Sequence, residues 1–395
     1  MGARAPHWSG RSTLACSALV LGVVACALPA ATLGDGVTTS DGAGGSGATG
    51  GSGGATGGSG GATGGSGGGT SSKPGCELDC GVSVGTAGCC DSQLVPGGSF
   101  QMGRSTSGND AEQSADSDPY GYGPAEKPEH PIVLSPFRLD TFEVTVGRFR
   151  DFVTAGGGTQ SSPPEPGAGA DPSVPNSGWN IAWVGALVAD KTLLTQALQC
   201  GEPGFHTWTD DPATNEQKPQ NCVSWTEAFA FCAWDGGWLP TEAEWEFAAA
   251  GGSENRYFPW SSPAASTSVD ASEASFFDGA SCVGDGASGC APTDVVRVGS
   301  KLGGAGAYGH YDLGGNVWEW VFDWYRFDWY TKSTCTADCA NTDDPDVVAE
   351  PAPNQRVIRG GGYHDTAPTL RAAHRYSLLP SARQQNVGFR CARAP

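Results

Sequence analysis

The stretch GWLPTEAEWEFAAAGG, residues 237–252, decides the fold, because it contains a turn, a helix start, a helix and a stop in sixteen residues. Pro240 cannot continue a helix from upstream. Thr241 can cap a new helix, and Glu244, three residues later, completes a capping box. A run of alanines then favours helix, and a glycine pair ends it. We therefore predict a short, tightly specified helix between Pro240 and the glycine pair.

Weaker patterns on either side predict two more helices and several short strands. Thr145 precedes an apolar helical face that ends at Gly156, and Ser224 forms a second capping box with Glu227. Short strands are predicted within residues 95–103, at 132–134 and at 137–144, and further ordered blocks at 309–320, 357–363 and 387–392. Residues 157–221 and 252–310 show little periodicity. The fold class expected is therefore α+β, rich in loops and low in regular secondary structure.

The first 30 residues predict an export signal, because a basic start precedes an apolar run too short to suit a membrane span. Val23-Val-Ala-Cys26 looks like a bacterial lipobox, in which Cys26 would be lipidated. The alternative is an ordinary signal peptide cleaved near Ala31. We expect an exported protein of the bacterial cell envelope, as an outer-membrane lipoprotein or in the periplasm, or a secreted one.

Residues 31–75 form a linker of Gly, Ser, Ala and Thr in which the heptad GATGGSG recurs from Gly47, Gly54 and Gly61. Such a composition cannot bury a hydrophobic face and predicts disorder. A Gly/Ser chain of some 40 residues reaches about 35 Å. The linker therefore suits a tether that holds a folded domain away from a membrane.

The net charge of −20 constrains the partners. An acidic surface argues against binding to nucleic acid and against anionic lipid, so membrane association is expected only through the lipid anchor. The same surface would favour divalent cations. The sequence does not predict an oligomeric state.

Fourteen cysteines occur in the chain, and twelve remain when Cys16 and Cys26 are set aside. An even number after an export signal predicts disulfides. Four of them lie in a Cys-rich entry segment, residues 76–91: Cys76, Cys80, Cys89 and Cys90. Two local pairs are expected in short loops, Cys282 with Cys290 and Cys335 with Cys339. The remaining four would close the main core: Cys200, Cys222, Cys232 and Cys391. The connectivity stays open. A zinc site would need nearby histidines or Cys-x2-Cys pairs.

Seven short blocks follow one another along the folded part. They are PGGSFQMG at 96–103, EVT at 143–145, NCVSW at 221–225, LPTEAEW at 239–245, GNVWEW at 315–320, RGGG at 359–362 and GFR at 388–390. Together they resemble the formylglycine-generating enzyme, or sulfatase-modifying factor, family over about residues 92–395. The resemblance implies a compact, loop-rich, disulfide-stabilised domain related to the C-type lectin fold.

The resemblance also implies a chemistry whose ligands are missing at the matching positions of this chain. The best-known members oxidise a sulfatase cysteine to formylglycine with molecular oxygen and copper bound by two cysteines. In those enzymes a Ser follows the Arg-Gly-Gly block, and the two cysteines come after it. Here Gly362 stands at the Ser position, and Asp365 and Leu370 stand near the cysteine positions. Copper(I) prefers thiolates. We therefore expect no copper and no classical activity, and no catalytic residue is assigned.

Two histidines and a carboxylate, His364, Asp365 and His374, are the raw material of a non-haem iron site, which other family branches use. The alternative to an iron site is that these three residues are polar side chains that line a loop and bond to backbone.

Calcium is the cation that the resemblance favours. Its ligands would be Asp312, the carbonyls of Gly315 and Val317, and Glu319. Calcium takes six to eight oxygens, backbone carbonyls included. The alternative is a glycine turn with surface carboxylates.

Aromatic and basic residues could line a ligand groove. Trp225, Trp245, Trp318 and Trp320 are expected in the core, whereas Trp324, Tyr325, Trp329 and Tyr330 are better surface candidates. A basic cluster comprises Arg371, Arg375, Arg383 and Arg390. It either pairs internally with the Glu-rich helix or cradles an anionic peptide or sugar. The candidate groove is His364, Asp365, Arg371, His374 and Arg375.

Two function classes follow. The first is a non-catalytic surface module that keeps the scaffold, uses calcium and disulfides for stability, and binds a peptide or glycan. The alternative is an oxidoreductase or protein-modifying enzyme with altered metal ligands, such as iron.

Overall fold

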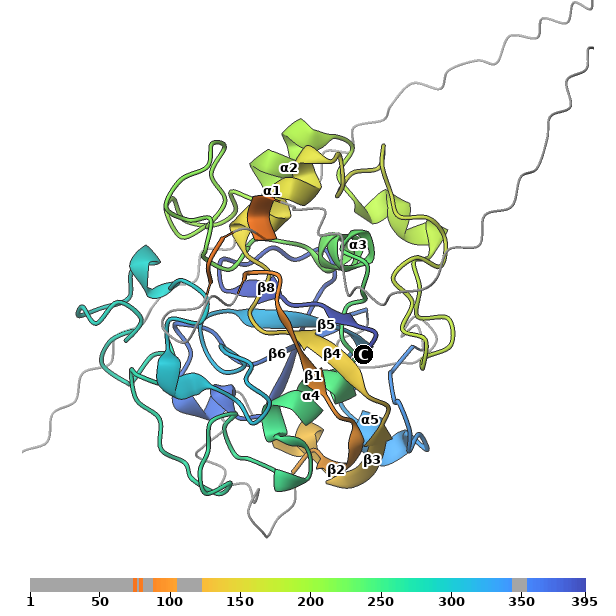
Figure 1. The fold of residues 1–395 in the computed structure, drawn as a ribbon, viewed down its shortest axis with the longest axis vertical. Coiled ribbons are helices and arrows are strands. Elements are labelled where there is room, and N and C mark those ends of the chain that lie inside the picture. The colour runs from red at the N-terminus through yellow and green to blue at the C-terminus, as the bar shows by residue number, and fades with distance from the viewer. Residues whose placement is uncertain (1–73, 77, 81–87, 105–122, 343–353) are drawn as a thin grey trace, which may run out of the picture. The chain divides into compact units, whose positions relative to one another are not determined.

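The computed structural model describes residues 74–76, 78–80, 88–104, 123–342 and 354–395 (Figure 1). The predicted signal, the lipobox cysteine and nearly all of the linker lie outside these residues. All described residues belong to one compact unit, Gly68–Pro395. No helix within the described ranges is long and apolar enough to cross a membrane.

A four-stranded sheet in the order β7-β6-β5-β8 forms the centre. Its strands are β5 (Trp318–Trp324), β6 (Arg356–Arg359), β7 (Arg375–Leu378) and β8 (Val387–Phe389). β6 is antiparallel to both β5 and β7, whereas β8 runs parallel to β5. The GNVWEW, RGGG and GFR blocks therefore meet on adjacent strands, although they are far apart in the sequence.

Two smaller sheets complete the strands. In the first, β4 (Phe137–Asp140) pairs with β1 (Ser92–Val95) and β9 (Ala392–Arg393), and in the second β2 (Gly98–Met102) pairs with β3 (His130–Leu134). All of these pairs are antiparallel. The predicted strand at 137–144 is shorter in the structure, because the chain bends at Thr141 and Phe142 before the Thr145 cap of the next helix.

The three predicted helices are present as α1 (Val146–Thr154), α3 (Trp225–Trp234) and α4 (Glu242–Ala250). In α4, Oγ1 of Thr241 accepts from the Glu244 N–H at 3.1 Å, and the Glu244 carboxylate accepts from the Thr241 N–H at 2.8 Å. Gly251 ends the helix at φ 68°, a conformation that glycine adopts without strain. The capping box of α3 is also formed.

Two short helices were not predicted, α2 (Lys191–Ala197) and α5 (Trp329–Lys332). Only Leu194 of α2 is buried, so its sequence carries no apolar stripe, although Asp190 caps it by accepting from the Leu193 N–H. The remaining helical turns are 3-10: Pro74–Cys76, Gly123–Glu126, Ile181–Ala186, Gly252–Glu254, Pro292–Asp294, Leu302–Gly304 and Ala367–Leu370. Most of the region predicted as irregular is irregular.

The central sheet is covered on both faces, because successive side chains of a strand point to opposite sides. Trp320 packs with Phe149 of α1 and Phe229 of α3 in one hydrophobic cluster. Its neighbour Val321 packs with Trp245 of α4 in another. Figure 1 shows α3 and α4 on either side of β5. The four tryptophans predicted to be core, Trp225, Trp245, Trp318 and Trp320, are all buried.

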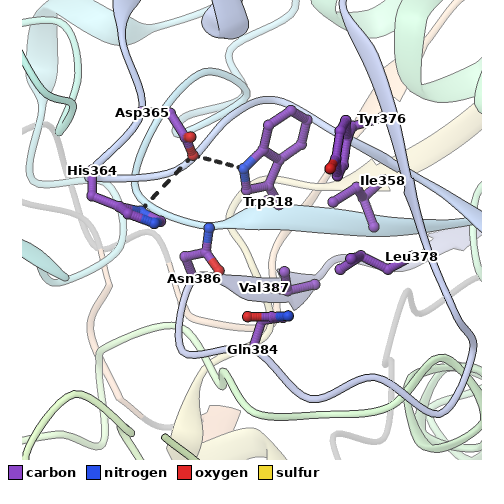
Figure 2. Close-up of a pocket in the computed structure, with 9 residues that line it drawn as sticks. All are labelled: Trp318, Ile358, His364, Asp365, Tyr376, Leu378, Gln384, Asn386 and Val387. Atoms are coloured by element: carbon purple, nitrogen blue, oxygen red, sulfur yellow. Dashed lines mark hydrogen bonds and ion pairs between the residues drawn. The ribbon is translucent and has the colours of Figure 1, made fainter. Parts of the chain in front are cut away.

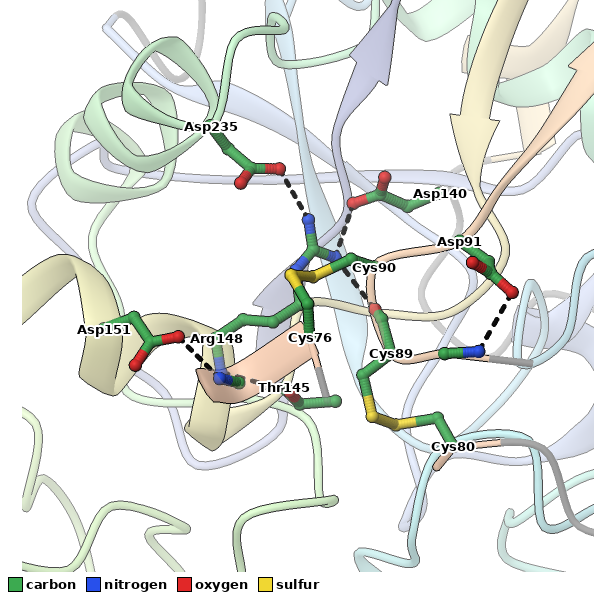
Figure 3. Close-up of a disulfide and its surroundings, with 12 residues drawn as sticks. Cys76, Cys80, Cys89, Cys90, Asp91, Asp140, Thr145, Arg148, Asp151 and Asp235 are labelled. Atoms are coloured by element: carbon green, nitrogen blue, oxygen red, sulfur yellow. Dashed lines mark hydrogen bonds and ion pairs between the residues drawn. A yellow bond between two sulfur atoms is a disulfide. The ribbon is translucent and has the colours of Figure 1, made fainter. Parts of the chain in front are cut away.

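Six disulfides join the twelve cysteines of the described part. The pairs are Cys76–Cys90, Cys80–Cys89, Cys200–Cys222, Cys232–Cys391, Cys282–Cys290 and Cys335–Cys339. The widest joins α3 to the last strands across 159 residues. Figure 3 shows the entry segment beside Arg148, whose guanidinium donates to Asp140 and Asp235 at 2.8 Å each. These crosslinks hold loops that have little secondary structure of their own.

Candidate functional site

A cavity of about 210 Å³ opens over the central sheet, beside the start of β5 (Figure 2). It is lined by Trp318, Ile358, His364, Asp365, Tyr376, Leu378, Gln384, Asn386 and Val387. The strands β5 to β8 supply its floor, and the loop after the RGGG block supplies its wall. Asp365, near which the resemblance puts the first copper-binding cysteine, lies in this cavity.

The RGGG block turns the chain away from β6 so that His364 and Asp365 reach the cavity. Gly360 has φ 97° and Gly361 has φ 73°, which L side chains rarely adopt. A Cβ at Gly361 would also lie 2.9 Å from the Leu370 side chain. The glycines are therefore required by the turn itself, whatever the chemistry beyond it.

Asp365 is held as a hydrogen-bond acceptor. Its Oδ2 accepts from Nε1 of Trp318 at 2.7 Å and from the Gly362 N–H at 3.0 Å, and the residue is 8% exposed. Nδ1 of His364 lies 3.9 Å from the same oxygen, and its side chain is 46% exposed. Figure 2 shows both hydrogen-bonding and ionic partners around this carboxylate. Asp365 orders the loop rather than presenting a free carboxylate.

Gly362 and Leu370 show why the classical site is not formed. A Cβ at Gly362 would lie 3.3 Å from Oδ2 of Asp365 and 3.3 Å from Cδ1 of Trp318, so a Ser there would crowd the bonded pair. Leu370 is fully buried in a hydrophobic cluster with Trp260 and does not line the cavity. Every cysteine of the described ranges is in a disulfide.

The prediction of a five-residue groove is wrong for three of its members. Arg371 and His374 do not line the cavity; both contact Glu126, Arg371 through two bonds of 2.6 and 2.7 Å and His374 at 2.9 Å. Burial opposes ionisation of Glu126, but Arg371 and His374 outweigh it and lower its pKa to about 2. Arg375 binds Glu242 of α4 at 2.6 and 2.8 Å. All three side chains are buried, so none can cradle a ligand.

Internal ion pairing therefore accounts for the basic cluster. Arg383 bonds to Glu227 of α3, and Arg390 bonds to Glu319 through two contacts of 2.7 Å. The Glu-rich helix α4 pairs with Arg359 as well, through Glu242 and Glu246. Buried charges need such partners, because an unpaired one carries a large desolvation cost.

Two of the four aromatic residues predicted to lie at the surface, Tyr325 and Tyr330, are buried. Tyr325 and Tyr330 are 6% and 3% exposed, whereas Trp324 and Trp329 are part-exposed. The Arg375 guanidinium lies 4.5 Å from the centroid of the Tyr330 ring, and the Tyr330 hydroxyl donates to Glu246. Tyr330 is therefore buried because it contacts two members of the internal ion pairs. A strand-like block followed by aromatics does not reveal this.

Two of the candidate calcium ligands belong to a cluster of three buried carboxyl groups with one guanidinium. Asp312, Glu319 and Glu143 are 4%, 0% and 0% exposed, and Arg390 is the guanidinium that pairs with Glu319. Burial, then the charges of Asp312 and Glu319, raise the pKa of Glu143 well above its usual range. Burial is also the main cause that raises the pKa of Asp312 to about 6. Sequence reasoning missed Glu143, although the EVT block marked it.

The backbone at the same place offers oxygen atoms. Gly315 and Val317 are buried, and no hydrogen bond to either carbonyl oxygen occurs among the described residues. Buried carbonyls are normally paired. Unpaired carbonyls next to repelling carboxylates fit a hard divalent cation, although Glu319 is already bonded to Arg390 and to Nε1 of Trp245.

An iron triad is not assembled. His374 lies with Glu126 instead of lining the cavity with His364 and Asp365. Within the described ranges, no group of three or more His, Cys, Asp or Glu side chains could hold a metal ion.

Comparison with known proteins gives a consistent result. Residues 86–395 match the family model described as "Sulfatase-modifying factor enzyme 1-like domain". The chain is 30% identical over 321 residues to the formylglycine-generating enzyme of Thermomonospora curvata, covering 76% of this chain and 92% of that protein. It is also 30% identical over 316 residues to inactive C-alpha-formylglycine-generating enzyme 2 of Bos taurus, covering 75% and 86%.

Among solved structures, PvdO from Pseudomonas aeruginosa aligns with a TM-score of 0.47 at 21% identity, over 76% of this chain and 93% of that one. The Treponema denticola variable protein 1 aligns with a TM-score of 0.43 at 18% identity, over 80% and 98%.

Proposed function

The chain belongs to the sulfatase-modifying factor enzyme 1-like family, and we propose that it is a non-catalytic member that binds a ligand in the Trp318 cavity. The observation that carries this proposal is the state of the two cysteine positions. Asp365 is tied to Trp318 and Gly362, and Leu370 is buried in the core. Copper(I) has no thiolate to bind among the described residues, because each of their cysteines is crosslinked.

The relatives support this proposal without deciding it. One is named a formylglycine-generating enzyme and another an inactive one, at the same 30% identity. The scaffold is therefore found both with and without the activity, and the residues of the site must distinguish the two cases.

The cavity favours a short peptide segment over a glycan as its ligand. Ile358, Leu378 and Val387 give it an aliphatic wall, and Gln384 and Asn386 add amide groups that can bond a peptide backbone. At about 210 Å³ it is smaller than most cavities for drug-sized ligands, which begin at about 300 Å³. It suits one side chain of a bound peptide.

Calcium forms part of the proposal as a structural ion. Asp312, Glu319 and the carbonyls of Gly315 and Val317 would hold it, with Glu143 adding negative charge. Bound calcium would neutralise repelling carboxylates that otherwise share the Arg390 guanidinium. We also propose that the domain is exported, tethered through the linker and lipidated Cys26, and of the C-type lectin-like class.

The alternative function is a family oxidoreductase with altered ligands, such as non-haem iron. The observation that favours it is the exposed His364 imidazole beside Asp365 at the mouth of the cavity. Elemental analysis of the purified full chain distinguishes the two. Calcium without stoichiometric iron or copper supports binding, whereas one bound iron or copper per chain supports chemistry.

The binding proposal is tested by screening the full chain against a library of displayed random peptides. Bound sequences should share one apolar residue, and Asn386→Ala should weaken them. Selection of no consensus, or binding unaffected by Asn386→Ala, would contradict a peptide site in this cavity.

A further inference from the structure

A second and larger cavity, of about 590 Å³, shares no residue with the Trp318 cavity. Its walls come from the irregular segment around residues 166–183, from the end of β5 and from the start of β6. Its volume lies within the range of about 300–1,000 Å³ that is usual for ligand sites. Nothing in the family resemblance points to this place.

Four of the twelve lining residues are aromatic, and their rings differ in exposure. Trp179 and Phe322 are 2% and 4% exposed and form the buried wall, whereas Trp183 and Trp324 are part-exposed. The rings of Trp179 and Trp183 stand at 88° with centroids 5.6 Å apart. Part-exposed indoles give flat apolar faces beside polar groups. The C–H face of a pyranose ring can pack on such a surface.

Trp324 is held in place by a guanidinium that packs on its ring. The Arg356 guanidinium lies 3.5 Å from the centroid of Trp324 and 3.7 Å from that of Trp225, and Arg356 is 1% exposed. Cation–π contacts of this kind are stronger when the cation is buried. The indole is therefore a rigid platform, which lowers the entropy lost when a ligand packs on it.

Hydrogen-bonding groups surround the rings. Nε1 of Trp179 is buried and has no hydrogen-bond partner in the described chain. Because that atom is shielded from solvent, it is also out of a ligand's reach, and the groups that can bond a ligand are the exposed ones. Asn176 and Thr342 are exposed at the rim, and the Asn180 side-chain oxygen already accepts from the Ala182 N–H, which leaves its NH2 group to donate. Amides and hydroxyls match the donors and acceptors of sugar hydroxyls.

The charge of the lining narrows the ligand class. The chain carries −20 overall, yet the twelve lining residues include no Asp or Glu, and their one cation, Arg356, is buried between two rings. Such a lining gives no electrostatic attraction to a cationic peptide. Ile181 is its one branched aliphatic residue, in contrast with the three that line the Trp318 cavity.

We propose that this second cavity binds a neutral saccharide, with Trp183 and Trp324 packing on the ring and Asn176 and Asn180 bonding its hydroxyls. The site is separate from the peptide-binding cavity proposed above and does not depend on it.

The full chain is titrated with maltohexaose, mannohexaose and the hexamer of N-acetylglucosamine, followed by indole fluorescence and calorimetry. At least one neutral sugar should bind, and Trp183→Ala and Trp324→Ala should each weaken it at least about tenfold. Trp183→Phe should retain part of the affinity, because it keeps an aromatic face. Phe327→Ala removes an exposed aromatic outside the cavity and serves as the control. Near-ultraviolet circular dichroism and the unfolding midpoint show whether each variant is folded.

Absence of binding by all three sugars up to about 10 mM overturns the proposal. So does equal affinity in wild type and in folded Trp183→Ala and Trp324→Ala proteins. Binding of hexagalacturonate with none of the neutral sugars would assign an anionic ligand instead. The variant Asn386→Ala separates the two cavities: it should leave sugar affinity unchanged, and a loss there would move the sugar to the Trp318 cavity.

Discussion

The indole nitrogen of Trp318 donates a 2.7 Å hydrogen bond to Oδ2 of Asp365, at the place where the oxidising relatives are expected to carry a copper-binding cysteine. The same oxygen also accepts from the Gly362 N–H. Two donors thus converge on one carboxylate oxygen, and a Cβ at residue 362 would crowd both partners. Trp318, Gly362 and Asp365 thus form a structural hydrogen-bond network at the position where the resemblance places the thiol site.

Asp365→Ala should therefore reduce stability. It leaves the Trp318 and Gly362 donors without their acceptor, which costs about 1–3 kcal/mol of unfolding free energy. The matched control is His364→Ala, which changes the exposed neighbour and should stay within about 0.5 kcal/mol of wild type. Denaturant unfolding of both variants measures the difference. Equal stabilities would mean that the network does not order the loop.

Glu244 should make stability fall as pH rises. Burial, then the charge of Asp171, raise its pKa from 4.5 to about 8. Below pH 4.5 the carboxyl is protonated in both states, but between pH 4.5 and 8 only the unfolded chain ionises, which favours unfolding. The full effect is at most about 5 kcal/mol.

Glu244→Gln removes this titration, because glutamine cannot ionise, and the measured difference includes the response of Asp171, whose charge acts on Glu244. Carboxyls such as Asp323, whose pKa is also raised, titrate in both proteins. The stability difference between variant and wild type should shift in favour of the variant from pH 5 to pH 8. Glu254→Gln, on a side chain that is 54% exposed, is the control. A difference independent of pH would contradict the raised pKa.

The long-range disulfide should matter most for stability. Cys232–Cys391 closes 159 residues, whereas Cys335–Cys339 closes four. Loop-closure entropy predicts losses of about 5 and about 2 kcal/mol when each pair is replaced by alanine. Unfolding midpoints of the two double variants test this order. The reverse order would show that strain or residual structure outweighs chain entropy.

Calcium should raise the unfolding temperature, because a ligand that binds only the folded state stabilises it, by about 2.7 kcal/mol at 100 times its dissociation constant. The effect should weaken as pH falls through about 6, the pKa of Asp312, since protonation removes a ligand charge. Asp312→Asn should abolish the calcium response, and Asp278→Asn, at an exposed loop, should not. Identical melting with calcium and with chelator would exclude the site.

The sequence anticipated features that depend on local signals. The capping boxes at Ser224 and Thr241 and the glycine stop at Gly251 predicted two helices, because caps act within one turn of the chain. Of the predicted groove, only His364 and Asp365, which follow the RGGG block, line the cavity. The partners of Arg371 and His374 could not be predicted, because Glu126 lies about 245 residues away in sequence and belongs to no motif. Gln384 and Asn386 were missed because neither belongs to a motif, although both lie just before the GFR block.

The burial of the aromatic residues on α5 could not be predicted from the sequence pattern. Tyr330 and Trp329 are neighbours on the short helix α5, yet only Tyr330 is buried, because Arg375 and Glu246 lie beneath it. Burial there is decided by long-range ion pairs rather than by periodicity.

The central claim is that the family scaffold here lacks formylglycine-generating activity. It is tested most directly by incubating the full chain with a peptide carrying the sulfatase cysteine motif, copper and a thiol reductant, and following the peptide by mass spectrometry. The relative from Thermomonospora curvata, assayed in parallel, is the positive control. We predict no aldehyde product above the enzyme-free background. Aldehyde formed in repeated turnovers by this chain would contradict the account.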